Sequence, residues 1–338
     1  MRRRVHWKYV ATTLTWIAWV GIGSTAYASG RPERFGEVAW FGHGPVTLVL
    51  VPCLGCDWRA WDGFMARNGE LYTMAAVTWP GLGATSMPDL ESREEPSETP
   101  LWDYLDRALE NLLSCHGIED PVLVGHSAAA VSVVRFAADH PTLVRAVVAV
   151  DGTITNWDTF GYSRSERRAW AEAQFADVRK RYDNEQAWRR LNSPPKLPDS
   201  DRSAFYGRMW LRPPRENVLS YWAEWLKVDV GTRMAELDTP LLGLYAIGDD
   251  EDAGEVRRKK LARFERAGAK DTTQVAFVEG VGHSIWEYDM EAFEQHLKRF
   301  LDSIEKRSSG SAPRSGSTSS SGLPPAGHQQ AGRCASPR

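Results

Sequence analysis

Short runs of β-branched and other apolar residues alternate along this chain with stretches of helical periodicity. The strand-like runs are Val46–Val51, Met74–Thr78, Pro121–Val124, Val144–Val150, Pro240–Ile247 and Gln274–Val278. The helical stretches are Trp58–Asn68, Leu101–His116, Ala128–Asp139, Glu255–Ala267 and Ile285–Lys306. Strand, helix and strand in this order form a βαβ unit, whose strands lie parallel. The sequence therefore predicts an α/β fold with a mostly parallel sheet flanked by helices.

One interval, from Gly152 to Glu236, has no strand-like run and consists of helical segments. It follows the run Val144–Val150, and open α/β sheets bind ligands at the carboxyl ends of their strands. We therefore predict a helical cap at residues 152–236, inserted into a core formed by residues 29–151 and 237–306. Six tryptophans in this cap indicate an apolar pocket or, more typically, packing of the cap on the core.

The two ends of the chain differ from the rest. Residues 1–28 hold Arg2, Arg3, Arg4 and Lys8, then a mostly apolar run, and end in Ala-Tyr-Ala, which is the order of a secretory signal peptide. Several Thr and Ser residues interrupt the run, which disfavours a retained membrane anchor. Residues 307–338, rich in Ser, Gly and Pro, are typical of a disordered tail. We expect a protein exported to the periplasm or the medium.

Charge excludes one class of partner. The whole chain has a formal charge of −3, but its two ends hold eight basic residues and no acidic ones. The folded part between them therefore carries about −11, and no excess of positive charge attracts it to nucleic acid. We expect no nucleic-acid partner and no stable membrane anchor.

Three cysteines, Cys53, Cys56 and Cys115, lie in the folded part, and Cys334 lies in the tail. Export permits disulfides, and three thiols allow at most one bridge among themselves. The spacing of Cys53 and Cys56 also fits a redox pair or half of a zinc site, but no second pair at ligand spacing accompanies it. A structural bridge or simple packing is favoured, and neither a metal nor a cofactor is predicted.

The most specific local pattern is a strand that leads directly into a helix with Ser127 at the turn. An exposed serine at the tip of a sharp strand-to-helix turn needs small residues two positions away on either side. Gly125 and Ala129 meet that need, although the usual pattern has a second glycine where this chain has Ala129. An ordinary helix N-cap serine is the alternative interpretation.

The spacing of several motifs resembles the α/β-hydrolase superfamily, and more narrowly its capped serine hydrolases, from Val38 to Glu305. The matching segments are Val51–Gly55, Trp79–Gly83, Gly125–Ser127, Gly248–Asp249 and Gly280–His283. Serine, acid and histidine also occur in the chain order of that family's catalytic triad.

The resemblance implies that Ser127 is the nucleophile and His283 the general base. His283 also lies in a glycine-rich loop after the last strand-like run, unlike the other histidines. The acid is less defined. Asp249 stands where the family places its carboxylate, with Asp250 and Asp252 as neighbouring alternatives. Asp151, after Val150, is a second possible location.

The family stabilises the reacting oxyanion with two backbone N–H groups. The resemblance assigns them to Ala128, after the nucleophile, and to Leu54, in the loop after Val46–Val51. This loop has Pro52-Cys53-Leu54 where the family often carries His-Gly-x, so Cys53 is an alternative donor.

These features together predict an exported serine hydrolase that cleaves an ester-like bond through an acyl-enzyme on Ser127. Serine at the turn argues against the family's dehalogenases and epoxide hydrolases, which attack with Asp. The alternatives are a C–C bond hydrolase, lactonase or perhydrolase with the same triad, or a non-catalytic binding protein on the same scaffold. The expected substrate is a small molecule, an apolar acyl compound.

Overall fold

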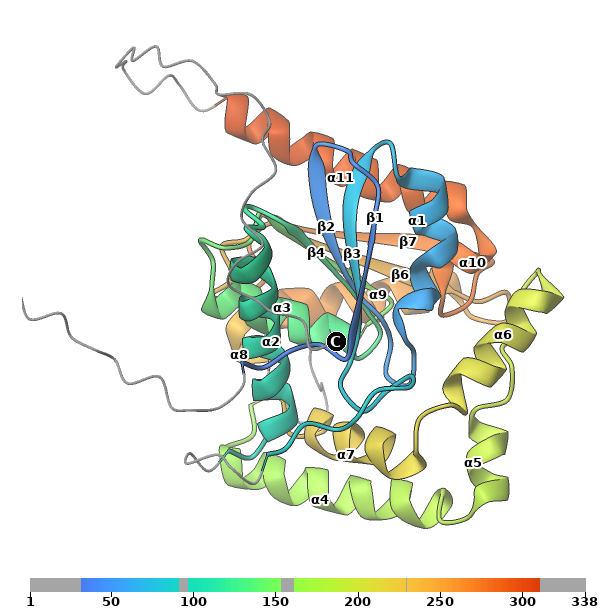
Figure 1. Cartoon of the computed structure of the whole chain (residues 1–338). Helices are drawn as coiled ribbons and strands as arrows, with labels where there is room; N and C mark the ends of the chain where they lie inside the picture. The colour runs from blue at the N-terminus through green and yellow to red at the C-terminus, as the bar shows by residue number, and fades with distance from the viewer. Residues whose placement is uncertain (1–31, 91–96, 153–160, 229, 311–338) are drawn as a thin grey trace, which may run out of the picture. The chain divides into compact units, whose positions relative to one another are not determined.

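The computed structural model describes residues 32–90, 97–152, 161–228 and 230–310 (Figure 1). The predicted signal peptide, residues 153–160 of the predicted cap and residues 311–338 of the predicted tail lie outside these ranges. Across the residues that are described, no helix has both the length and the apolar character needed to cross a membrane.

A seven-stranded sheet forms the centre of the fold, in the order β1-β3-β2-β4-β5-β6-β7. The strands are β1 Glu37–Phe41, β2 Val46–Val51, β3 Tyr72–Thr78, β4 Val122–His126, β5 Ala146–Val150, β6 Leu241–Ile247 and β7 Thr273–Glu279. Only β1 pairs antiparallel, with β3, and all other neighbours are parallel. The predicted fold class is confirmed. Each predicted strand is present, whereas β1, at the edge of the sheet, had no counterpart among them.

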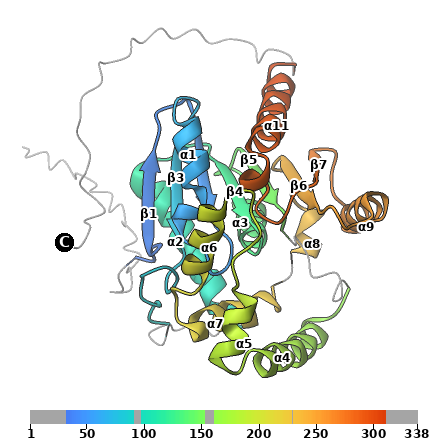
Figure 2. The same ribbon diagram turned by 90° about the vertical axis from the view of Figure 1, so that its right-hand side faces the viewer.

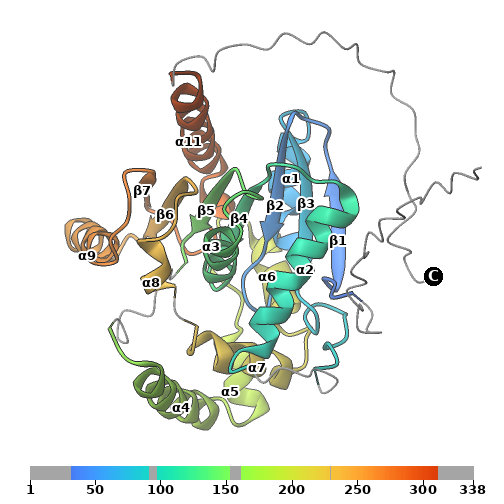
Figure 3. The ribbon, with the colours of Figure 1, turned by 90° about the vertical axis from the view of Figure 1, so that its left-hand side faces the viewer.

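Helices cover both faces of this sheet. They are α1 Asp62–Asn68, α2 Pro100–His116, α3 Ala129–Asp139, α9 Ala253–Arg266, α10 Ile285–Tyr288 and α11 Met290–Gly310, with a 3-10 turn at Trp58–Trp61 before α1. Helices α2 and α3 lie on one face (Figure 3) and α1 and α11 on the other (Figure 2).

Successive side chains of each strand belong in turn to two hydrophobic cores, one on each face of the sheet. Val49 and Leu123 pack with residues of α2 and α3, while Leu48 and Val122 pack with residues of α1 and α11. Successive side chains of a strand point to opposite faces, so strands covered on both sides are apolar throughout. This explains why the strand-like runs of the sequence are continuous rather than alternating.

The last predicted helix, Ile285–Lys306, differs from the structure in two ways. It is divided at Asp289, whose side chain accepts a hydrogen bond from Ala292 N at 2.8 Å and so begins α11 as a separate helix. Helix α11 then continues to Gly310, beyond the predicted start of the tail at residue 307.

Every described element between β5 and β6 is a helix, as the sequence predicts for the cap. These helices are α4 Arg164–Arg181, α5 Glu185–Leu191, α6 Ser200–Trp210, α7 Arg215–Trp225 and α8 Gly231–Met234. Figure 1 shows α4 to α7 together, on the side of the sheet toward which β2 runs. The cap therefore lies at the carboxyl ends of the parallel strands.

Helix α7 joins the cap to the core through buried hydrogen bonds. The Tyr221 hydroxyl donates to the carbonyl of Pro80 at 2.9 Å. The Glu224 carboxylate accepts from the backbone N–H groups of Leu101 at 2.8 Å and Trp102 at 3.3 Å. The first N–H groups of a helix have no partner within it. Glu224 of α7 thus provides a hydrogen-bond acceptor for the first turn of the core helix α2.

The same contact makes stability depend on pH. Burial raises the pKa of Glu224 to about 7, and the two N–H donors oppose this shift only in part. A carboxyl with a higher pKa in the folded chain stabilises the fold below the unfolded pKa, and this contribution is lost as the pH rises through 7.

We therefore expect the free energy of unfolding to fall between pH 5 and pH 8 in the wild type by up to about 3 kcal/mol more than in Glu224→Gln. Urea denaturation at the two pH values measures the difference. Glu216→Gln, exposed on the same helix, should follow the wild type. Equal pH dependence in Glu224→Gln and the wild type would contradict this account of Glu224.

Candidate active site

Ser127 stands between β4 and α3 in a strained backbone conformation. Its φ is +59°, in the left-handed region that residues other than glycine seldom adopt. Its backbone N–H donates to the carbonyl of Val150, at the end of β5, at 2.9 Å. The residue is partly exposed, whereas Ala128 and Ala129 beside it are buried. This is the strand-to-helix turn that the sequence predicts.

Two glycines make room for the turn. A Cβ atom at Gly125 would lie 2.5 Å from the carbonyl oxygen of Ala129, and one at Gly152 would lie 2.1 Å from Cβ of Ala130. Both distances are too short for van der Waals contact, so any larger residue forces the turn to move. The sequence reasoning identified Gly125 but missed Gly152, whose only signal is that it follows Asp151 at a strand end.

His283 pairs with Asp151. The imidazole Nδ1 and Oδ2 of Asp151 are 2.7 Å apart, and the other carboxylate oxygen of Asp151 accepts from the N–H of Ala246 at 3.2 Å. Asp151 directly follows β5 and has a φ of +40°. The His283 side chain is 51% exposed and that of Asp151 17%, so the imidazole is accessible to a small molecule while the carboxylate is largely covered.

The hydrogen-bond partner of His283 is therefore the alternative acid, not the preferred Asp249. Asp249 and Asp250 lie exposed in the turn after β6. Asp252 caps α9 by accepting from the N–H of Glu255 at 2.9 Å. Among the described residues, none of these three carboxylates is hydrogen-bonded to His283.

The loop of His283 lies against the strand that carries Ser127. The ring of His126, the residue before Ser127, is 4.5 Å from the ring of His283 between centroids. Within the described residues no hydrogen bond joins the Ser127 hydroxyl to His283. The structure thus brings acid and histidine into direct contact and places the serine at the adjoining strand end. Catalytic hydrogen bonds are often long before substrate binds.

The predicted oxyanion donors come from neighbouring strands. Leu54 follows β2 and Ala128 follows β4, and these strands pair in parallel with Val51 opposite Gly125. Neither backbone N–H donates a hydrogen bond to another described residue. The two groups at the same sheet edge are therefore available to an incoming oxygen atom.

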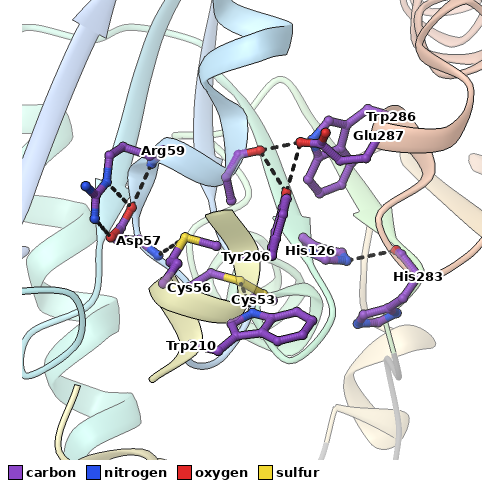
Figure 4. The surroundings of a disulfide bond; sticks show 12 residues. Cys53, Cys56, Asp57, Arg59, His126, Tyr206, Trp210, His283, Trp286 and Glu287 are labelled. Carbon is purple, nitrogen blue, oxygen red and sulfur yellow. Dashed lines mark hydrogen bonds and ion pairs between the residues drawn. A yellow bond between two sulfur atoms is a disulfide. The ribbon is translucent and has the colours of Figure 1, made fainter. Parts of the chain in front are cut away.

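The loop of Leu54 is closed by a disulfide between Cys53 and Cys56. The two cysteines of the Cys-Leu-Gly-Cys sequence thus form a bridge, in keeping with the favoured interpretation, and Cys115 is disulfide-bonded as well. Cap residue Trp210 lies against the bridge and donates from Nε1 to Sγ of Cys56 at 3.2 Å (Figure 4). The bridge ties the loop of the predicted oxyanion donor to the cap.

A second contact of α6 reaches the helix that follows His283. The hydroxyl of Tyr206 donates to Glu287 of α10 at 3.1 Å, and Arg202 donates to both oxygens of that carboxylate, at 3.1 and 2.5 Å. Figure 4 shows Tyr206 pointing from the cap to Glu287. No local pattern predicts this contact, because its members lie 81 to 85 positions apart.

The arrangement matches what acyl transfer needs: a serine in a partly exposed turn, a histidine paired with a largely covered carboxylate, and two N–H groups at the same sheet edge. The comparison with protein families agrees with this geometry. The model described as the alpha/beta hydrolase family matches residues 48–296.

The chain belongs to the alpha/beta hydrolase family. It is a hydrolase enzyme.

Solved structures support the assignment of the fold. An esterase from Rhodococcus has a TM-score of 0.56 and 17% identity, covering 79% of this chain and 94% of its own. E-2-(acetamidomethylene)succinate hydrolase has a TM-score of 0.55 and 22% identity, covering 78% and 94%. A hydrolase from Pseudomonas aeruginosa reaches 0.59 with 16% identity, covering 81% and 99%.

A relative among curated proteins matches over a shorter stretch. The abhydrolase domain-containing protein abhd-5.2 of Caenorhabditis elegans is 26% identical over 104 residues, which is 31% of this chain. The match spans 22% of the length of that relative.

The pairing of His283 predicts which carboxylate supports activity. Asp151→Asn keeps the size of the side chain and tolerates the positive φ, but it removes the charge that stabilises a protonated imidazole. We expect kcat/KM for an activated aryl ester to fall on the order of 10³- to 10⁴-fold.

Asp249→Asn is the matched control, because it makes the same change in the exposed turn after β6. Its activity should stay within about twofold of the wild type, since surface substitutions seldom disturb a structure. A larger loss of kcat/KM in Asp249→Asn than in Asp151→Asn would instead identify Asp249 as the acid.

Proposed function

We propose that this hydrolase is a serine hydrolase that cleaves ester-like bonds through an acyl-enzyme on Ser127. The observation that carries the proposal is the 2.7 Å contact between Asp151 and His283, beside a serine held at a φ of +59°. A base oriented by a carboxylate next to an accessible hydroxyl is the arrangement that activates a serine nucleophile.

In the proposed reaction, Oγ of Ser127 attacks the acyl carbon while Nε2 of His283 takes the hydroxyl proton. Asp151 accepts the hydrogen bond from Nδ1 and stabilises the imidazolium. The N–H groups of Leu54 and Ala128 bind the oxyanion. The imidazolium then gives its proton to the leaving alcohol, and a water molecule, activated by His283, releases the acid product.

We further propose a small substrate with an apolar acyl group. The support is the aromatic composition of the cap, where Trp210 and Tyr206 lie over the loop of Leu54. The same triad also serves lactone opening, perhydrolysis and C–C bond hydrolysis, so these reactions are outcomes that the experiment has to separate.

A fluorophosphonate probe tests the nucleophile directly. We expect covalent labelling of the wild type at Ser127, located by peptide mass spectrometry, and none in Ser127→Ala. A panel of short- and medium-chain acyl esters should be hydrolysed by the wild type, and turnover in Ser127→Ala should fall by about 10⁶-fold, as for other serine nucleophiles.

Each other outcome has a defined meaning. Folded wild type that stays unlabelled would refute the nucleophile. Labelled enzyme that ignores every ester would favour C–C bond cleavage or another reaction of the same triad. Ligand binding that is indifferent to loss of both Ser127 and His283, without turnover, would favour a binding protein.

We also propose that the chain is exported and that its first 28 residues are removed. The order of charged, apolar and small residues in that segment supports this. The disulfide between Cys53 and Cys56 is compatible with it, because disulfides persist in oxidising compartments.

Expression in a bacterial host with a Sec system tests export. We expect the protein in the periplasm or medium, with an N-terminus at Ser29 by Edman degradation. Ala28→Arg, which places a large charged residue at the cleavage site, should leave the precursor uncut. Cytosolic protein that retains Met1 would refute export.

A further inference from the structure

His126 is a buried polar residue to which the proposed reaction assigns no role. It ends β4 directly before Ser127, and no part of it is exposed. Its ring stands edge-on to Trp286 at 4.7 Å and to Trp61 at 6.3 Å between centroids. A polar side chain in such surroundings is costly unless a hydrogen bond offsets its burial.

That hydrogen bond goes to the backbone of the proposed base. Nε2 of His126 lies 2.9 Å from the carbonyl oxygen of His283, and Figure 4 shows the ring pointing at it. A carbonyl oxygen only accepts, so Nε2 carries the proton and donates. Nδ1 is buried and has no partner among the described residues, so the ring is neutral.

The environment keeps the ring in this state. Burial and the neighbouring His283 lower the pKa of His126 well below its ordinary value of 6.5. Protonation would place an N–H at Nδ1 where no acceptor is available. His126 therefore does not compete with His283 for the proton of Ser127.

The loop of His283 needs such support. Gly280 has a φ of +72°, and Gly282 packs so closely on Tyr288 that a Cβ atom would lie 2.6 Å from its hydroxyl. Backbone N–H groups of Gly280 and Val281 donate to the carbonyl of Ile247 at 2.8 and 3.3 Å and so hold the start of the loop. The contact from His126 is made farther along, at the carbonyl of His283 itself.

We propose that His126 is a positioning residue, which fixes the backbone of His283 through its Nε2–H and so sets the distance from the base to Ser127. The proposal rests on the proposed serine hydrolase function, because it assigns His283 the role of base. It links the residue before the nucleophile to the base by one hydrogen bond.

Two nearly isosteric substitutions separate this role from core packing. His126→Gln keeps an N–H donor near the position of Nε2, whereas His126→Met has a similar length and no donor. Both lose the ring contact with Trp286. In the full-length enzyme, with active sites counted by fluorophosphonate labelling, we expect kcat for an aryl ester to fall about 10²-fold in His126→Met.

His126→Gln should retain at least tenfold more kcat than His126→Met, with KM unchanged in both. A residue that only fills space would lower the melting temperature of both variants equally and leave kcat for each labelled site alike. Equal kcat values in the two variants would therefore overturn the proposal.

A measurement on the wild type covers the case in which neither variant folds. In protein labelled with ¹⁵N-histidine, the ring of His126, identified by its contact with Trp286, should be the Nε2–H tautomer at pH 6 with a slowly exchanging proton. The Nδ1–H tautomer or a charged ring would overturn the proposal. Wild type that is not labelled by fluorophosphonate would instead refute the proposed function.

Discussion

The geometry of this hydrolase depends on one backbone hydrogen bond, from the N–H of Ser127 to the carbonyl of Val150. It extends the parallel pairing of β4 and β5 by one residue past His126, which stands opposite Val150. The chain then leaves both strands in the left-handed region, at Ser127 on one and at Asp151 on the other. The proposed nucleophile and the proposed acid are therefore placed by the same strand pair. Gly152 packs closely against the turn of Ser127, since a Cβ atom on it would lie 2.5 Å from the carbonyl oxygen of Ser127.

The histidine comes from farther away and needs contacts of its own. Its strand, β7, is separated from β5 by β6, so strand pairing alone does not bring His283 to Asp151. The short helix α10 completes the placement. Its Trp286 stacks on Trp61 at 4.0 Å and donates to the carbonyl of Ala60 at 3.0 Å. This contact fixes the segment that follows the histidine, as the carboxylate of Asp151 fixes its ring.

Much of this was predictable, because the strands, the elbow at Ser127 and the glycine-rich loop of His283 are local patterns. The acid was not. Asp151 directly follows β5, and Asp249 follows β6 after one intervening residue. The two strands end at the same edge of the sheet, so the local pattern and the chain order permit either residue as the partner of His283. The choice depends on the φ of +40° that turns the Asp151 carboxylate toward the histidine, and on the exposure of Asp249. Both are properties of the folded chain.

The contacts of the cap were likewise not predictable from the sequence. The absence of strand-like runs predicts its helices and their place in the chain, but the residues that join it to the core, such as Tyr221 and Pro80, lie far apart in the sequence.

The parts of the cap are attached to different degrees. Helix α4 has one buried residue, Ala171, within its described length, whereas α6 buries Tyr206 and Met209 against the disulfide loop. The hydroxyl of Tyr206 shares its hydrogen between the Glu287 carboxylate and the carbonyl of Ala60, which lies 3.2 Å away and also accepts from Trp286 of α10. The carbonyl of Ala60, in the 3-10 turn before α1, thus joins α6 to the helix after the proposed base. A substitution in α6 would therefore reach the disulfide loop and the segment after His283, whereas α4 contributes to the core only Ala171 and the partly buried Phe175 and Val178.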